Sequence, residues 1–130
     1  MTLLRRVLKV QAALWVFCGV ALGLFPTRVI SALGQLPVLE VAWLRMLGVT
    51  GVVLALFMFL VAQRLDEVWW WAWAFALLEV GIGTLAVLNV VLGQYAGEAW
   101  AWWAIGGVSL GFAALDLIGL ALTGREKPFT

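Results

Sequence analysis

The sequence predicts an all-α integral membrane protein, a bundle of four transmembrane helices in a single domain over residues 1–130. Three observations predict this fold class. Of the 130 residues, 65% are hydrophobic and 12% are charged, and the mean hydropathy is +1.09. Soluble domains carry about 25% charged residues, so this chain has too little charge to cover a surface that faces water. Apolar segments long enough to cross a bilayer recur along the chain, and turn or charge signals separate them.

Crossing about 30 Å of hydrocarbon takes about 20 mainly apolar helical residues. The segments that meet this requirement are residues 7–25, 41–62, 68–92 and 99–122. Arg5, Arg6 and Lys9 precede the first segment, as in a signal peptide, but no Ala-x-Ala-like cleavage site follows. Phe17, where a lipoprotein signal would have a small residue, precedes Cys18. We therefore expect the first segment to be a retained transmembrane helix.

A short amphipathic helix is expected between the first two spans. Val29, Ile30, Leu33 and Leu36 share one face of a helical pattern, and polar residues occupy the other positions. Such a helix is typical of an element that lies on the membrane surface. Packing over the bundle is the simpler interpretation, and a lid over a cavity is the alternative.

Lysine and arginine positions predict the orientation, because cytoplasmic loops carry an excess of both. The side that we expect to be cytoplasmic has six such residues, namely Arg5, Arg6, Lys9, Arg64, Arg125 and Lys127. Arg28 and Arg45 fall toward the other side. The prediction is a multi-pass protein of a prokaryotic inner membrane with both termini in the cytoplasm.

The aromatic residues predict two belts at the membrane–water interfaces, where an indole or phenol ring stays apolar and its polar group stays wet. The cytoplasmic belt contains Trp69, Trp70, Trp71 and Trp73, and the opposite belt contains Trp43, Tyr95, Trp100, Trp102 and Trp103. Trp15 lies well inside a span. We interpret the belts as structural anchors.

Ionisable residues inside the bilayer are costly, so each one is a functional candidate. Glu79 lies near the middle of the third span and Asp116 lies in the fourth span. Each acid falls on a stripe of small or polar residues at steps of three and four. These stripes are Ala72, Ala76, Glu79, Gly83, Ala86, Asn89 and Ser109, Ala113, Asp116, Gly119, Thr123. Buried without a cation, Glu79 should be mostly protonated at neutral pH. The two acids could hydrogen-bond between the third and fourth spans, form a proton- or ligand-linked site, or contact another subunit.

Other polar and small residues complete the expected interior. Arg45 is a cation near the outer end of the second span, and pairing with Asn89 or with Glu40 is more plausible than pairing with Glu79. The first span can offer Gln11 and Cys18 to the interior. The glycines expected at helix contacts are Gly19, Gly23, Gly48, Gly107 and Gly111.

Several motifs resemble the small four-helix membrane proteins grouped as DoxX-like or BphX-like. They are Phe25-Pro26, then Leu33-Gly34-Gln35-Leu36-Pro37, then Trp43-Leu44-Arg45-Met46-Leu47-Gly48, and Ala114-Leu115-Asp116-Leu117. The resemblance carries over Arg45, Gly48 and Asp116 and does not extend to Glu79. Since some DoxX-type proteins accompany oxidoreductases, it implies that a quinone-linked oxidoreductase subunit is a further alternative.

Missing residues narrow the chemistry. The chain has no histidine and one cysteine, which excludes bis-His haem, His-ligated zinc and copper sites, and an internal disulfide or dithiol redox pair. With a net charge of +1 and no basic tract, it has no footprint for nucleic acid. We predict no metal, no cofactor and no catalytic residues. The expected function is a non-catalytic accessory or assembly component that lies in the lipid bilayer and docks on a membrane-protein partner or on copies of itself. The alternative is a small proton-coupled transporter that uses Glu79 and Asp116.

Overall fold

A computed structural model describes residues 1–37 and 40–126, and this part of the chain is helical with short connections. The elements are α1 (Thr2–Leu24), α2 (Pro26–Ala32), α3 (Val41–Gln63), α4 (Leu65–Val68), the 3-10 turn η1 (Trp69–Trp71), α5 (Ala72–Val91) and α6 (Trp100–Glu126). Four helical stretches are long and apolar enough to cross a membrane, with α4, η1 and α5 forming one of them. The predicted all-α fold with four membrane-length helices is confirmed, as in a multi-pass membrane protein.

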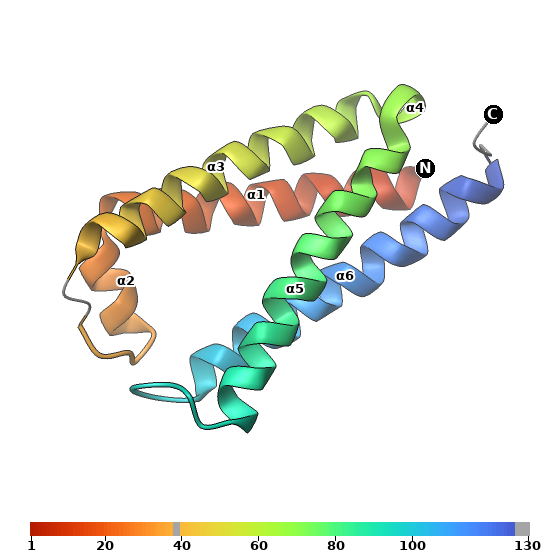
Figure 1. The fold of residues 1–130 in the computed structure, drawn as a ribbon. Helices are drawn as coiled ribbons and strands as arrows, with labels where there is room; N and C mark the ends of the chain where they lie inside the picture. The colour runs from red at the N-terminus through yellow and green to blue at the C-terminus, as the bar shows by residue number, and fades with distance from the viewer. Residues whose placement is uncertain (38–39, 127–130) are drawn as a thin grey trace.

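The helices form two antiparallel pairs (Figure 1). One pair is α1 with α3, the other is α5 with α6, and α1 also packs against α6. Both termini lie at the same end of the bundle in Figure 1. There the amino group of Met1 lies 3.1 Å from a carboxylate oxygen of Glu126.

Glycines let the helices of the first pair come into backbone contact. A Cβ added to Gly19 of α1 would lie 2.7 Å from the carbonyl oxygen of Gly48, and one added to Gly48 would lie 2.6 Å from the Gly19 oxygen. No side chain larger than hydrogen fits at either position without moving a helix. Gly19 and Gly48 therefore confirm the helix contacts expected of them, and small residues at such contacts are typical of membrane bundles.

The hydrophobic core lies toward the end that carries the termini. Its largest fully buried apolar side chains are Leu4 and Leu8 of α1, Met58 of α3 and Leu65 of α4. Trp69, expected in the cytoplasmic belt, joins this core and is 4% exposed. Since η1 interrupts the helix there, the Trp69 ring turns inward, while Trp70, Trp71 and Trp73 remain exposed.

At the opposite end, two connections meet. Gly97 has φ +111°, and a Cβ added to it would lie 2.5 Å from the carbonyl oxygen of Gly34. The side-chain amide of Gln35 donates to the Glu98 carbonyl at 2.8 Å. The expected amphipathic helix forms as α2, with Pro26 at its first position, but it ends at Ala32. Leu36 therefore lies outside it and is 60% exposed.

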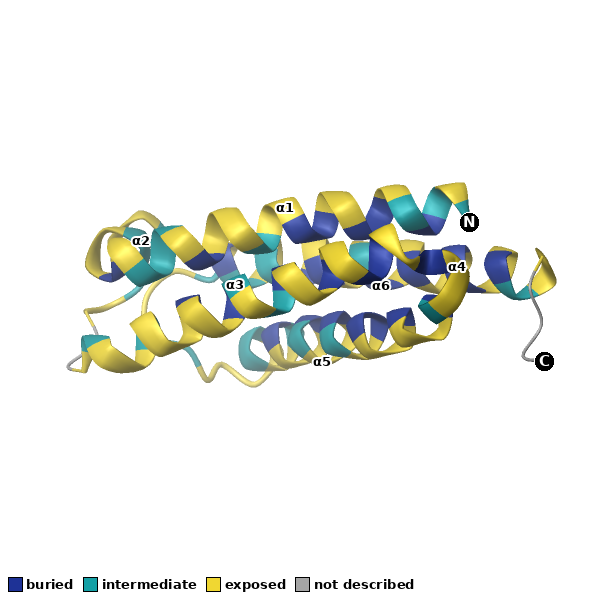
Figure 2. Cartoon of the chain, turned by 90° about the horizontal axis from the view of Figure 1, so that it is seen from above, coloured by how far each residue is buried: buried dark blue, intermediate teal, exposed yellow. Residues whose placement is uncertain are grey.

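Exposed residues lie along the outward faces of the long helices (yellow in Figure 2), and many of them have large apolar side chains. The buried residues follow narrow stripes on the facing sides of the helices in the same view. In a soluble protein such an apolar surface would aggregate, whereas it suits a chain surrounded by lipid.

Candidate functional site

The candidate site is a buried polar cluster between the two helix pairs. Glu79 of α5 is 2% exposed. One of its carboxylate oxygens, Oε1, accepts two hydrogen bonds from α1, at 2.9 Å from Gln11 Nε2 and at 2.7 Å from Trp15 Nε1. Both lengths are those of good hydrogen bonds. The cluster therefore connects α1 with α5.

Asp116 of α6 completes the cluster. It is fully buried, lies next to Gln11 and is within electrostatic range of Glu79. Neither of its carboxylate oxygens has a hydrogen-bond partner of good geometry among the described residues, and the same holds for Gln11 Oε1. Three buried acceptor atoms thus meet without a donor between them. Buried polar groups are nearly always paired, so this group calls for an explanation.

The predicted stripes explain why the acids face inward. In both stripes the small residues on either side of the acid are buried with it, and Asn89 at the end of the α5 stripe is half-buried. Gly119 follows Asp116 by three residues, and its Cβ would lie 3.0 Å from the Leu4 backbone, which brings α1 close to α6. Gly83 brings α5 close to α6 in the same way, because a Cβ added to it would lie 2.7 Å from the Leu110 side chain.

The expected direct bond between Glu79 and Asp116 is not formed. The donors to Glu79 come from α1, so the cluster connects the two helix pairs instead of linking α5 to α6 alone. The prediction that the first span offers Gln11 to the interior is confirmed. Cys18 was wrongly expected beside it, since its side chain is exposed on the outer face of α1.

Sequence reasoning missed Trp15, the second donor to Glu79. Gln11 and Trp15 are four residues apart, which places them on one face of α1. Trp15 also lies over Gly51 of α3, where an added Cβ would be 3.4 Å from its ring. A tryptophan deep in a span, one turn from a buried glutamine, was the signal that could have identified it.

Arg45 and Asn89 do not take part in the cluster. Arg45 is exposed near the start of α3, and in the described part of the chain it forms no ion pair. Its expected partner Glu40 instead accepts a hydrogen bond from Trp43 at 2.7 Å. A position at the end of α3 lets the long Arg45 side chain reach outward, so it needs no buried partner.

The predicted helix-packing glycines divide into two groups. Gly19 and Gly48 are in tight contact, and a Cβ on Gly48 would also lie 2.6 Å from the backbone nitrogen of Gly23. Gly107 and Gly111 are exposed, and an added Cβ on either would meet no atom within 4 Å. They do not pack against another helix of this chain, because the buried face of α6 is the opposite one.

Most of the predicted interface anchors lie on the surface. Trp43, Trp70, Trp71, Trp73, Trp100 and Trp103 are exposed, and Tyr95 and Trp102 are half-buried. The Trp102 indole nitrogen donates to the side-chain oxygen of Gln35 at 3.3 Å. Trp102 thus helps to hold the connection after α2 against α6.

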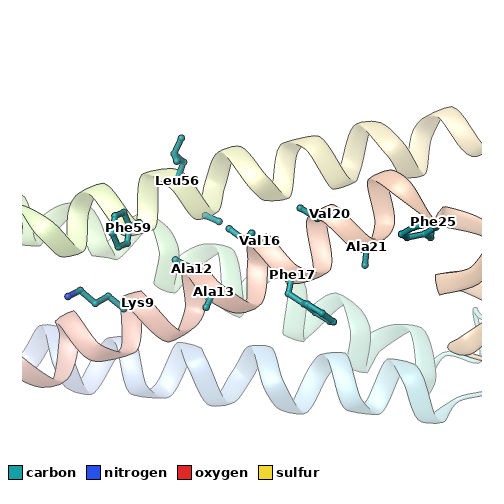
Figure 3. A pocket seen from close by; sticks show the side chains of 11 residues that line it. Lys9, Ala12, Ala13, Val16, Phe17, Val20, Ala21, Phe25, Leu56 and Phe59 are labelled. Carbon is teal, nitrogen blue, oxygen red and sulfur yellow. The ribbon is translucent and has the colours of Figure 1, made fainter.

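A groove lies on the outer side of the α1–α3 pair, with a volume of about 990 Å³ (Figure 3). Apolar side chains line it, among them Val16, Phe17 and Phe59, and Lys9 lies at one end. Neither Glu79 nor Asp116 lines it. The groove and the polar cluster are therefore separate features on opposite sides of α1.

In residues 1–37 and 40–126, no group of three His, Cys, Asp or Glu side chains is arranged to hold a metal ion. In comparisons with known proteins, no family model, no curated protein and no solved structure matches this chain at a significant level.

Proposed function

We propose that this chain is a non-catalytic accessory or assembly component of a membrane complex, and that α6 is its docking helix. The observation that carries the proposal is a row of small residues on the outward face of α6. Ala104, Gly107, Gly111 and Ala114 follow one another at steps of three and four, and all four are exposed. Glycine costs about 1 kcal/mol relative to alanine in a helix interior. Among residues 1–37 and 40–126, no atom lies within 4 Å of a Cβ added to Gly107 or Gly111.

The chemistry of the row indicates the occupant. A flat strip of glycine and alanine lets a second helix approach until backbones touch, which is the usual contact between transmembrane helices. The ligand is therefore a transmembrane helix, from another subunit or from a second copy of the chain. An enzyme or a metal protein would need polar groups on an accessible surface, and this strip has none.

The transporter alternative requires water to reach Glu79 and Asp116. Both acids are buried, and the groove on the α1–α3 pair is lined by other residues. A closed cluster supports a structural role over a transport path. The resemblance to DoxX-like proteins is compatible with an accessory role, and it stays a proposal.

Native mass spectrometry from a mild detergent tests the docking proposal. We expect the wild-type chain to have the mass of an assembly of fixed composition. The double variant Gly107→Leu with Gly111→Leu should have the mass of the chain alone. Gly81→Leu is the matched control, because Gly81 is an outward glycine of α5 with nothing within 4 Å of an added Cβ. It should leave the assembly intact. A wild-type monomer, or an assembly that survives the double substitution, would refute the proposal.

We further propose that the chain resides in a prokaryotic inner membrane with both termini in the cytoplasm. Arg5, Arg6, Lys9, Arg64 and Arg125 belong to the end of the bundle where the termini meet. The excess of basic residues at that end supports this orientation. A C-terminal fusion to green fluorescent protein should be fluorescent and a fusion to alkaline phosphatase inactive; the reverse result would contradict the orientation.

A further inference from the structure

The polar cluster contains an imbalance of donors and acceptors. Gln11 Nε2 and Trp15 Nε1 both donate to the same carboxylate oxygen, Glu79 Oε1. Asp116 Oδ1, Asp116 Oδ2 and Gln11 Oε1 have no donor among the described residues. An ionised carboxylate and an amide oxygen only accept hydrogen bonds, so these atoms would repel one another.

The cluster also contains two carboxyl groups and no cation among the described residues. The described ion pairs use Met1, Arg5 and Arg64, and none of them includes Glu79 or Asp116. Two ionised carboxylates in one dry site, without a cation, would each lose their hydration and also repel one another. A like charge nearby disfavours the ionised form of a carboxyl group.

We propose that the cluster is a proton-binding site, in which Asp116 holds one proton and donates it to Gln11 Oε1. This proton supplies the one donor that the cluster lacks and satisfies two of its three unpaired acceptors. It also reduces the charge of the cluster from two negative charges to one.

The geometry selects Asp116 over Glu79 as the proton carrier. Glu79 Oε1 already accepts two N–H bonds, whereas neither carboxylate oxygen of Asp116 has a hydrogen-bond partner of good geometry among the described residues. A continuous chain of hydrogen bonds then runs from Asp116 through the Gln11 amide to Glu79 and Trp15. It joins α6, α1 and α5, and the proton is the link between α6 and α1. Asp116 takes this proton from water as the chain inserts and folds.

Infrared spectroscopy of the protein in liposomes at neutral pH tests the site. A protonated carboxylic acid has a carbonyl stretching band well separated from that of a carboxylate. The other acidic side chains, Glu40, Asp66, Glu67, Glu98 and Glu126, are exposed to solvent. We expect one protonated-acid band in the wild type.

Isotope labelling assigns the band without any substitution. Asp66 and Asp116 are the two aspartates of the sequence, so the band should shift on labelling with [¹³C]aspartate and stay in place on labelling with [¹³C]glutamate. D116N should abolish the band, while D66N and E79Q should retain it. D116N should also keep the melting temperature within about 3 °C of the wild type, because the Asn amide can donate to Gln11 in place of the acid.

Three results would overturn the proposal. An absent band means that both acids are ionised, and a band that follows glutamate labelling or disappears in E79Q places the proton on Glu79. The third is a melting temperature that rises in sodium or potassium chloride relative to choline chloride at equal ionic strength. That rise would identify a metal cation as the occupant.

Discussion

The two contacts that α1 makes across the bundle differ in kind. Toward α3, α1 packs closely at Gly19 and Gly48, where backbone meets backbone. Toward α5 and α6, it presents Gln11 and Trp15 to buried acids. Any atom added at Gly19 or Gly48 would disrupt the first contact. Loss of a hydrogen-bonding group would disrupt the second. One face of α1 thus packs closely against α3. Another face of α1 connects the α1–α3 pair to the α5–α6 pair through polar side chains.

Gly48→Leu is the strongest test of the contact by shape. The new side chain would begin 2.6 Å from the Gly19 oxygen, which is backbone and cannot move aside. We expect a loss of about 3 kcal/mol in the free energy of unfolding, the upper part of the usual range for overpacking. Titration of the refolded protein with sodium dodecyl sulfate in mixed micelles measures it.

Gly23→Leu is the matched control, since an added Cβ there meets no atom within 4 Å. It should unfold at nearly the same detergent fraction as the wild type. Equal losses in the two variants would show that the close approach of α1 and α3 does not determine the effect.

Glu79→Leu tests the polar contact between α1 and α5. It adds no clash with backbone, but it leaves Gln11 Nε2 and Trp15 Nε1 without their acceptor. A buried donor without a partner costs about 1–3 kcal/mol, and removal of a buried charge offsets part of this, so we expect a net loss of about 2 kcal/mol. The same titration measures it.

The control for this variant is Glu67→Leu, because Glu67 is exposed and its ion pair with Arg64 is on the surface. Such pairs contribute about 0.2–1 kcal/mol, so the expected loss is smaller. A Glu79→Leu protein as stable as the wild type would mean that the cluster does not hold the pairs together.

The sequence predicted the inward face of α5 and α6 well, because small residues and one acid recur there with a helical period. It did not predict which helix supplies the partners of Glu79. Period and hydropathy give the face of each helix, whereas the partner depends on how α1 crosses the second pair, and no local signal encodes that crossing. The surroundings of Arg45 and Trp69 were not predicted for a related reason. Both are near helix ends, where a long side chain or a 3-10 turn changes the direction in which a residue points.

Gly97→Ala extends the comparison to the outer end of the bundle, where the two pairs meet again through loops. Gly97 has φ +111°, and an added Cβ would lie 2.5 Å from the Gly34 oxygen. We expect a loss of about 1.5 kcal/mol, combining backbone strain with the clash. Gly93→Ala, with φ +66° and no atom within 4 Å, carries the strain alone. A thermal melt should rank Gly97→Ala below Gly93→Ala, and the opposite order would indicate that the loop contact contributes nothing.

Trp15→Phe has the smallest expected effect and separates packing from hydrogen bonding within the polar contact. Phenylalanine keeps most of the ring over Gly51 but removes the N–H group that donates to Glu79. Hydrogen bonds between membrane helices contribute about 0.6 kcal/mol on average and up to about 1.7 kcal/mol. A double-mutant cycle of Trp15→Phe with Glu79→Leu should therefore give a coupling energy in this range. Trp100→Phe removes a similar bond to Glu98 on the surface and should change stability less, because water replaces the lost partner. A coupling energy near zero would mean that Trp15 supports the bundle by its bulk and that Gln11 alone carries the polar connection between α1 and α5.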